Sequence, residues 1–199
     1  MTREGPRRES FAGRRERRAA VEDPQIVLEA AGHFLEARPR SIAEVRRRLG
    51  GAGYRVELVE GAIAKLLEFS VLDDEAFART WVESRDRARP RGERAIRQEL
   101  IQKGIERETI DIVLGERSAS ALASATTSEA GDEAVAPTAD RSAADRLLAK
   151  NRRALDRVAD PRQRRQRAYM LLARHGFDPE VCRTVAAGLD ATDDHADEE

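Results

Sequence analysis

The chain has 199 residues, of which 40% are hydrophobic, 37% charged and only 4% aromatic. This profile is typical of an all-α protein and disfavours a β-sandwich or barrel. No stretch approaches the roughly 20 apolar residues that a membrane helix needs, and residues 1–20 lack an apolar signal core. The one cysteine, Cys182, can form no internal disulfide. We therefore expect a cytoplasmic protein.

The charge is distributed unevenly along the chain, although its sum is only -1. Residues 146–189 carry eleven Lys or Arg against four Asp or Glu, which gives +7, whereas residues 190–199 carry six acids and no Lys or Arg, which gives -6. All but three of the 36 cationic residues are arginines, the side chain best suited to forked hydrogen bonds with phosphate or carboxylate.

Composition divides the chain into six segments. Residues 1–23 have few apolar groups and are predicted to be a disordered arm of mixed charge. Residues 117–140, rich in Ala, Ser and Thr, read as a flexible insert, and residues 190–199 as an acidic disordered tail. Between them lie three predicted three-helix repeats, at residues 24–69, 70–116 and 141–189.

The repeats are visible as fixed spacings. The motif ARPR occurs at residues 37–40 and 88–91, and ADPR occurs at 159–162. A leucine lies about ten residues after each proline, and a glycine lies four residues after each leucine. A glutamate lies four residues after each glycine, and a small or β-branched apolar residue lies nine residues after it. Such self-similarity indicates a repeated structure. The leucines are Leu49, Leu100 and Leu172; the glycines are Gly53, Gly104 and Gly176.

Each repeat predicts three helices. Prolines 39, 90 and 161 mark the start of the second helix, where a missing N–H costs nothing. The glycines fit a left-handed helix end, and the glutamates fit the first turn of the third helix. The first helices are predicted over about 25–38, 73–89 and 142–159. Because one such unit buries too little apolar surface alone, we expect the three to stack as a monomer with an elongated, curved body.

Catalytic chemistry is not indicated. Asp73, Asp74 and Glu75 are the one dense carboxylate cluster in the segments predicted to fold, and capping of the following helix explains them better than a metal or acid–base site. The three histidines have no metal-ligand spacing, Cys182 falls at a buried apolar position of the repeat, and no nucleotide-binding motif is present. We expect a protein that is not an enzyme and uses no cofactor or metal.

The basic residues of the second helices are the candidate interaction surface. Stacking would align them into one ridge suited to phosphate or to an acidic protein surface. The residues expected to contact a partner are Arg91, Arg94, Arg97, Lys103, Arg162, Arg165 and Arg167. Those expected to hold the structure together are Phe77, Trp81, Ile96, Leu100, Gly104, Leu172 and Gly176.

Two strings carry a family resemblance: VLDDEAFARTWVESR at residues 71–85 and IRQELIQKGI at 96–105. They resemble the RecX family, regulators of the bacterial RecA recombinase, and AYMLLARHGFDPEVC at 168–182 extends the resemblance more weakly. The resemblance implies tandem three-helix repeats and a protein that lies in the groove of the RecA filament on DNA. It would change ATP hydrolysis and strand exchange there, in recombination and DNA repair. Ser70 stands where a glycine is usual in the family.

Other functions are also compatible with the sequence. A helix-turn-helix-like regulator would use a basic helix to bind DNA directly, and weak binding of single- or double-stranded DNA is also compatible with a RecA regulator. The predicted last helices are acidic or apolar, which disfavours base reading. An enzyme that uses the Asp73 cluster is the third alternative.

Overall fold

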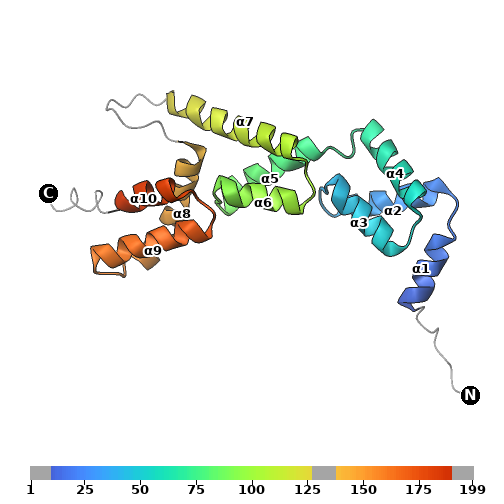
Figure 1. Ribbon diagram of the computed structural model, residues 1–199, viewed down its shortest axis with the longest axis horizontal. Helices are drawn as coiled ribbons and strands as arrows, with labels where there is room; N and C mark the ends of the chain where they lie inside the picture. The colour runs from blue at the N-terminus through green and yellow to red at the C-terminus, as the bar shows by residue number, and fades with distance from the viewer. Residues whose placement is uncertain (1–9, 127–137, 190–199) are drawn as a thin grey trace, which may run out of the picture. The chain divides into compact units, whose positions relative to one another are not determined.

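Helices make up most of the residues that the computed structural model describes, namely 10–126 and 138–189 (Figure 1). No strand occurs in these ranges, as the all-α prediction requires. The helices are α1 (Phe11–Ala19), α2 (Pro24–Glu36), α3 (Ile42–Ala52), α4 (Val56–Glu68), α5 (Asp74–Ala88), α6 (Glu93–Gln102), α7 (Arg107–Thr126), α8 (Ala139–Leu155), α9 (Pro161–Arg174) and α10 (Pro179–Ala187).

The chain forms two compact units. The first comprises the described residues up to 77 together with 103–105, and the second comprises 78–102 together with the described residues from 106 onward. The boundary falls inside α5. Helices α2 to α4 are therefore in the first unit, and α6 to α10 are in the second.

The first unit is built around the apolar stripes of α2, α3 and α4. Their inward residues recur three or four positions apart, which places them on one face of each helix. Leu72, from the turn before α5, completes the cluster. Its buried members are Val27, Ala31, Val45, Leu49, Val59, Ala62, Ile63, Leu66 and Leu72.

Helix α1 lies inside the segment that the sequence analysis assigned to a disordered arm. Ser10 caps it, because the Ser10 Oγ accepts a 3.0 Å hydrogen bond from the backbone N–H of Gly13. Within the first unit, the guanidinium of Arg18 lies 5.7 Å from the centre of the Tyr54 ring. Arginine stacking of this kind is a contact that a count of apolar residues misses.

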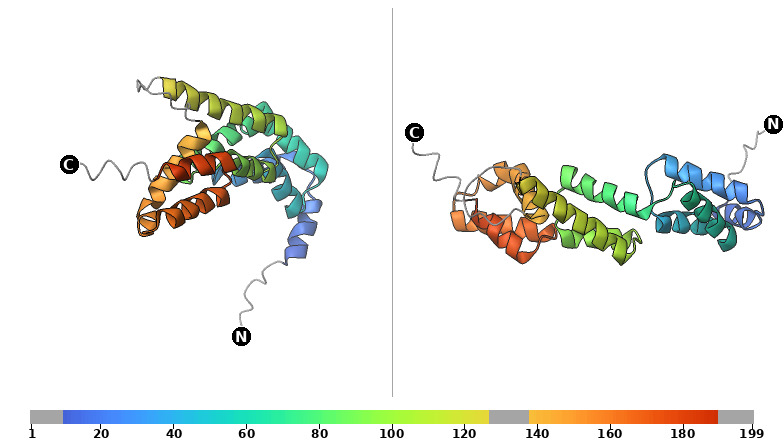
Figure 2. Two further views of the ribbon diagram at one scale, coloured as in Figure 1. Left: turned by 60° about the vertical axis from the view of Figure 1, so that its left-hand side comes forward. Right: turned by 90° about the horizontal axis from the view of Figure 1, so that it is seen from above.

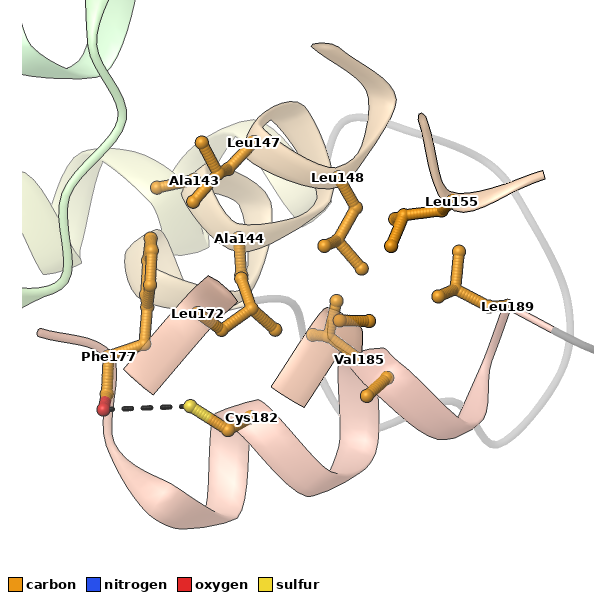
Figure 3. Close-up of a cluster of buried hydrophobic side chains, with 12 residues drawn as sticks. Ala143, Ala144, Leu147, Leu148, Leu155, Leu172, Phe177, Cys182, Val185 and Leu189 are labelled. Atoms are coloured by element: carbon orange, nitrogen blue, oxygen red, sulfur yellow. Dashed lines mark hydrogen bonds between the residues drawn. The ribbon is translucent and has the colours of Figure 1, made fainter. Parts of the chain in front are cut away.

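The second unit has buried apolar residues in its central helices and an apolar cluster among its last three helices. Ile96 and Leu100 of α6, both predicted to be structural, have no exposed surface. Helices α8, α9 and α10 surround a separate core that includes the predicted Leu172 (Figure 3). Each leucine or isoleucine buried in this way contributes about 1.5–3 kcal/mol relative to an exposed one.

The repeat glycines adopt the predicted conformation. Gly53, Gly104 and Gly176 have φ of 106°, 80° and 80°, the left-handed region that favours glycine. After Gly53 the N–H of Tyr54 donates to the Leu49 carbonyl, and after Gly176 the N–H of Phe177 donates to the Leu172 carbonyl. These are the bonds of a Schellman cap, so the glycine ends the second helix of its repeat.

The prolines behave less uniformly than the sequence suggested. Pro161 occupies the first turn of α9, but Pro39 and Pro90 lie three residues before the starts of α3 and α6. In those two repeats the helix begins later, at Ile42 and Glu93. Helix α9 consequently has 14 residues, against 11 in α3 and 10 in α6.

Part of the predicted insert is helical. Helix α7 continues to Thr126 and α8 begins at Ala139, which is three residues before the predicted start of that helix. Thr138 caps α8 by accepting a 3.2 Å hydrogen bond from the N–H of Arg141. Residues 127–137 of the insert and the acidic tail lie outside the described residues.

Candidate interaction surface

In the first unit, the start of α3 is held by residues from far along the chain. Ser41 donates a 2.6 Å hydrogen bond from its hydroxyl to the Lys103 carbonyl. The N–H of Ile42 donates to the Asp74 carboxylate at 2.9 Å. Because the first N–H groups of a helix have no partner within the helix, Asp74 satisfies a group that would otherwise be left open.

Glu44 strengthens the junction between the start of α3 and the residues around Asp74 and Lys103. It forms a capping box with Ser41 and accepts a 2.8 Å hydrogen bond from the Lys103 ammonium. Burial raises the pKa of the Glu44 carboxyl, but hydrogen bonds from Lys103 and Arg38 outweigh it, so the pKa lies below the ordinary value of 4.5. Lys103, predicted to contact a partner, is thus engaged in an ion pair within the protein.

The second unit repeats the arrangement at the start of α6. The N–H of Gly92 donates to the His175 carbonyl at 3.1 Å, and the N–H of Glu93 donates to the Asp140 carboxylate at 3.0 Å. His175 directly precedes Gly176, just as Lys103 precedes Gly104. Both junctions therefore join the start of one second helix to an aspartate and to a helix end of the following repeat.

The repeat glycines also lie at these junctions. A Cβ on Gly104 would overlap the side chain of Ala43 in α3, and a Cβ on Gly176 would overlap Ala95 in α6. The glycines are thus required twice, once for their backbone conformation and once for close approach. Gly104 and Gly176 were predicted to be structural, and they occupy positions consistent with that role.

Arg117 of α7 closes the junction in the second unit. Its guanidinium donates to Asp86 of α5 at 2.9 Å and to Asp140 of α8 at 2.6 Å. Only 6% of the Arg117 side chain is exposed. Burial lowers the pKa of Arg117, yet the hydrogen bonds from it to the two aspartates outweigh that effect and raise the pKa overall. Arg117 is not among the predicted site residues, because it is the first residue of the predicted insert.

Some of the predicted contact residues form ion pairs within the protein. Besides Lys103, Arg97 pairs with Glu93 and Asp111, and Arg91 lies 3.7 Å from Glu99. The pairs involving Arg97 and Arg91 are partly exposed, so each contributes little to stability.

The remaining four are on the surface of the second unit. Arg94 of α6 is exposed, as are Arg162, Arg165 and Arg167 of α9. In both Figure 1 and Figure 2, α9 runs alongside α10. Between these two helices lies a shallow depression of about 270 Å³. We call it the α9–α10 depression; it is lined by Arg162, Arg165, Gln166, Tyr169, Arg183, Ala186 and Ala187.

Arg183 is the residue of this surface that the sequence analysis did not select. It lies seven positions after Gly176, on the third helix of its repeat, whereas the predicted basic residues belong to second helices. The side chain is exposed on α10. The spacing of residues in a single helix cannot indicate such a contribution from a neighbouring helix.

Trp81 is half-buried in the second unit. Its indole N–H donates to the Glu99 carboxylate at 2.8 Å, and the Arg85 guanidinium lies 4.2 Å from the ring centre. Arg85 also donates to Glu99, at 2.6 Å. The tryptophan therefore connects α5 to α6 within one repeat through polar and cation–π contacts. Phe77, also predicted to be structural, is buried.

The residues considered for catalysis have structural surroundings. Asp73 accepts hydrogen bonds from the N–H groups of Glu75 and Ala76, which makes it the cap of α5. Cys182 is buried, its Sγ 3.6 Å from the Phe177 carbonyl oxygen (Figure 3), and burial raises the pKa of the thiol. Among the described residues, no group of three His, Cys, Asp or Glu is placed to hold a metal ion. No helix there is long and apolar enough to cross a membrane.

Comparison with known proteins identifies close similarity to one family. Residues 73–114 match the family model described as RecX, second three-helix domain. The chain is 30% identical over 159 residues to the regulatory protein RecX of Mycobacterium avium (strain 104), a match that covers 79% of this chain and 82% of that protein. It is 37% identical over 83 residues to the regulatory protein RecX of Chlorobium limicola, of which it spans about half, 52%.

Solved structures show the same fold. The crystal structure of RecX from Lactobacillus salivarius superposes with a TM-score of 0.66 at 18% identity, covering 85% of this chain and 98% of that one. A second crystal structure, of regulatory protein RecX, gives a TM-score of 0.61 at 21% identity, covering 89% and 73%. The fold is that of tandem three-helix repeats, and by its similarity along most of its length to the M. avium protein the chain belongs to the RecX family of regulatory proteins.

Proposed function

We propose that this protein binds the filament that the RecA recombinase forms on DNA and lowers its ATP hydrolysis and strand exchange, without chemistry of its own. The observation that carries the proposal is the match of 79% of the chain to a regulatory protein of the RecX family. RecA is the partner that the family resemblance implies, and its DNA-bound filament is a repeating polymer. A chain with three similar three-helix repeats suits such a partner.

The repeats give a physical reason for binding a filament. Several weak contacts on one chain act together, because after the first contact forms the others occur at a high effective concentration. A protein built in this way needs no deep binding pocket. It also couples the filament subunits that it touches, which accounts for an effect on ATP hydrolysis without a catalytic residue of its own.

The proposed contact surface centres on Arg94, Arg162, Arg165 and Arg167, which are exposed. Arg91, Arg97 and Lys103 would have to leave their intramolecular partners before they could bind another molecule. We therefore assign them a secondary contribution.

The test is the ATPase activity of RecA on single-stranded DNA, measured with and without this protein, together with strand exchange under the same conditions. We expect inhibition that saturates with added protein. An unchanged rate in both assays would contradict the proposal. The variant Arg94→Glu should weaken inhibition, whereas Arg107→Glu, which changes an exposed arginine at the start of α7, should not.

The same assays separate a filament regulator from a DNA-binding factor of the helix-turn-helix type. A regulator binds the RecA filament more tightly than it binds bare DNA. A sequence-reading factor instead selects one duplex in the absence of RecA, with a specific affinity typically 10³ to 10⁷ times its nonspecific affinity.

A further inference from the structure

The second helices of the three repeats differ at one end. Counted back seven residues from the buried leucine, the equivalent positions are Ile42 in α3, Glu93 in α6 and Arg165 in α9. Ile42 and Glu93 are the first residues of their helices, and the N–H of each is bound by an aspartate from the following repeat. Arg165 is the fifth residue of its helix, because α9 starts four residues earlier, at Pro161.

The additional turn changes what α9 can bind. Its N-terminus is capped by its own Asp160, which accepts a 2.9 Å hydrogen bond from the N–H of Arg162. The N–H of Arg165 lies within the helix, where it is not available to an incoming carboxylate. The surface that receives another repeat in α3 and α6 is therefore not a repeat-binding surface in α9.

Arginines take the place of the junction residues in α9. Arg165 corresponds to Ile42 and Glu93, and Arg167 corresponds to Glu44 and Ala95. In α3 and α6 the equivalent positions contact the following repeat, whereas in α9 they carry exposed arginines. The last repeat therefore presents exposed cationic side chains at these positions.

The side chains that line the α9–α10 depression favour a polyanionic strand over a folded protein as its ligand. Arg162, Arg165 and Arg183 contribute guanidinium groups from two helices, and Tyr169 adds a partly exposed aromatic side chain. No large exposed apolar side chain lines the depression, whereas the centre of a protein interface is usually formed by such residues. Arginine binds phosphate through paired hydrogen bonds, and an aromatic ring beside a basic groove suits a single strand.

We propose that the α9–α10 depression binds the phosphate backbone of single-stranded DNA, with Arg162, Arg165 and Arg183 as the contacting residues. This rests on the proposed function, which brings the protein to DNA inside a filament, and adds a direct protein–DNA contact at the end of the repeat array. Arg165 and Arg162 then act as phosphate ligands, and Arg162 lies in the additional turn of α9.

The experiment measures binding of the full chain to a fluorescein-labelled oligothymidine in the absence of RecA, over a range of salt concentrations. The variant Arg162→Gln/Arg165→Gln/Arg183→Gln removes three charges from the depression. The control Arg87→Gln/Arg107→Gln/Arg153→Gln removes three charges from exposed arginines of the same unit that do not line it. All six side chains are exposed, so we expect both variants to keep the wild-type helicity and melting temperature.

We expect the first variant to bind at least tenfold more weakly and the slope of log affinity against log salt to fall by about 2, since each single-strand phosphate contact contributes about 0.7. The control should change binding by less than threefold. Equal weakening by both variants would show that only net charge matters and would overturn the proposal.

The assay also separates this inference from the proposed function. If the first variant bound DNA like the wild type but no longer inhibited RecA, the depression would be a protein-binding surface and the inference would be wrong, while the regulatory function would stand. If DNA binding fell as expected but RecA activity were unaffected by the wild-type protein, the regulatory function would fail and the DNA site would stand.

Discussion

Asp140 of α8 binds the backbone N–H of Glu93, 47 residues earlier, with both carboxylate oxygens at 3.0 Å. The same carboxylate accepts a 2.6 Å hydrogen bond from Arg117. One aspartate therefore satisfies a helix start and a buried cation together. Both contacts lie at the junction between the last two repeats.

Removal of the buried cation should destabilise the second unit. Arg117→Met removes the buried guanidinium that Asp86 and Asp140 share, and breaking a buried ion pair in this way typically costs about 3–5 kcal/mol. We expect a loss of that size in urea unfolding followed by the fluorescence of Trp81, the single tryptophan. In the control Arg146→Met, an arginine that is 47% exposed and 3.6 Å from Asp86, the change should stay within about 0.5 kcal/mol. Similar losses in both variants would contradict the assigned role.

Two glycine substitutions should act in opposite directions. Gly176→Ala places a methyl group against Ala95 at a residue with φ of 80°, so we expect a loss of about 2–4 kcal/mol from strain and overlap together. Gly115→Ala adds the same methyl group in the interior of α7, with no atom within 4 Å, and should stabilise by about 0.5–1 kcal/mol. Thermal unfolding by circular dichroism measures both; stabilisation by Gly176→Ala would exclude the close junction.

Ser70 is the one described residue other than glycine with a positive φ, at 54°. Replacing it with glycine should raise the free energy of unfolding by about 0.5–1 kcal/mol, because the left-handed conformation costs glycine less. Ser84→Gly, in the interior of α5, should instead cost about 0.5 kcal/mol. A destabilised Ser70→Gly protein in chemical denaturation would refute this explanation.

Glu44 should make the first unit sensitive to acid. Its pKa in the folded protein is below the ordinary value of 4.5, so the unfolded chain takes up a proton first as the pH falls. The stabilisation by Glu44 is complete above that ordinary value and disappears as the pH falls through the lower, folded pKa.

The variant Glu44→Gln isolates this contribution. We expect it to be about 1 kcal/mol less stable than the wild type at pH 7, with the difference shrinking below pH 4.5. Glu57→Gln, an exposed glutamate in the first turn of α4, serves as the comparison and should show a smaller difference. A gap between wild type and Glu44→Gln that persisted unchanged into acid would show that the ion pair is not its source.

The sequence by itself determined the repeated local structure. Leu49, Leu100 and Leu172 are buried and the glycines four residues later are left-handed, because helix periodicity and backbone sterics are properties of short segments. The same reasoning identified the cap at Asp73, where a carboxylate beside a helix start has a local partner.

Only the tertiary structure decided which basic side chains are exposed and which form ion pairs within the protein. Lys103 and Arg94 look alike in the sequence, yet Lys103 pairs with Glu44, 59 residues away, while Arg94 is exposed. Arg117 and Arg183 gave no signal, because one is defined by two distant aspartates and the other by a neighbouring helix. An ion pair depends on the distance between groups in space, and no period along the chain records that distance.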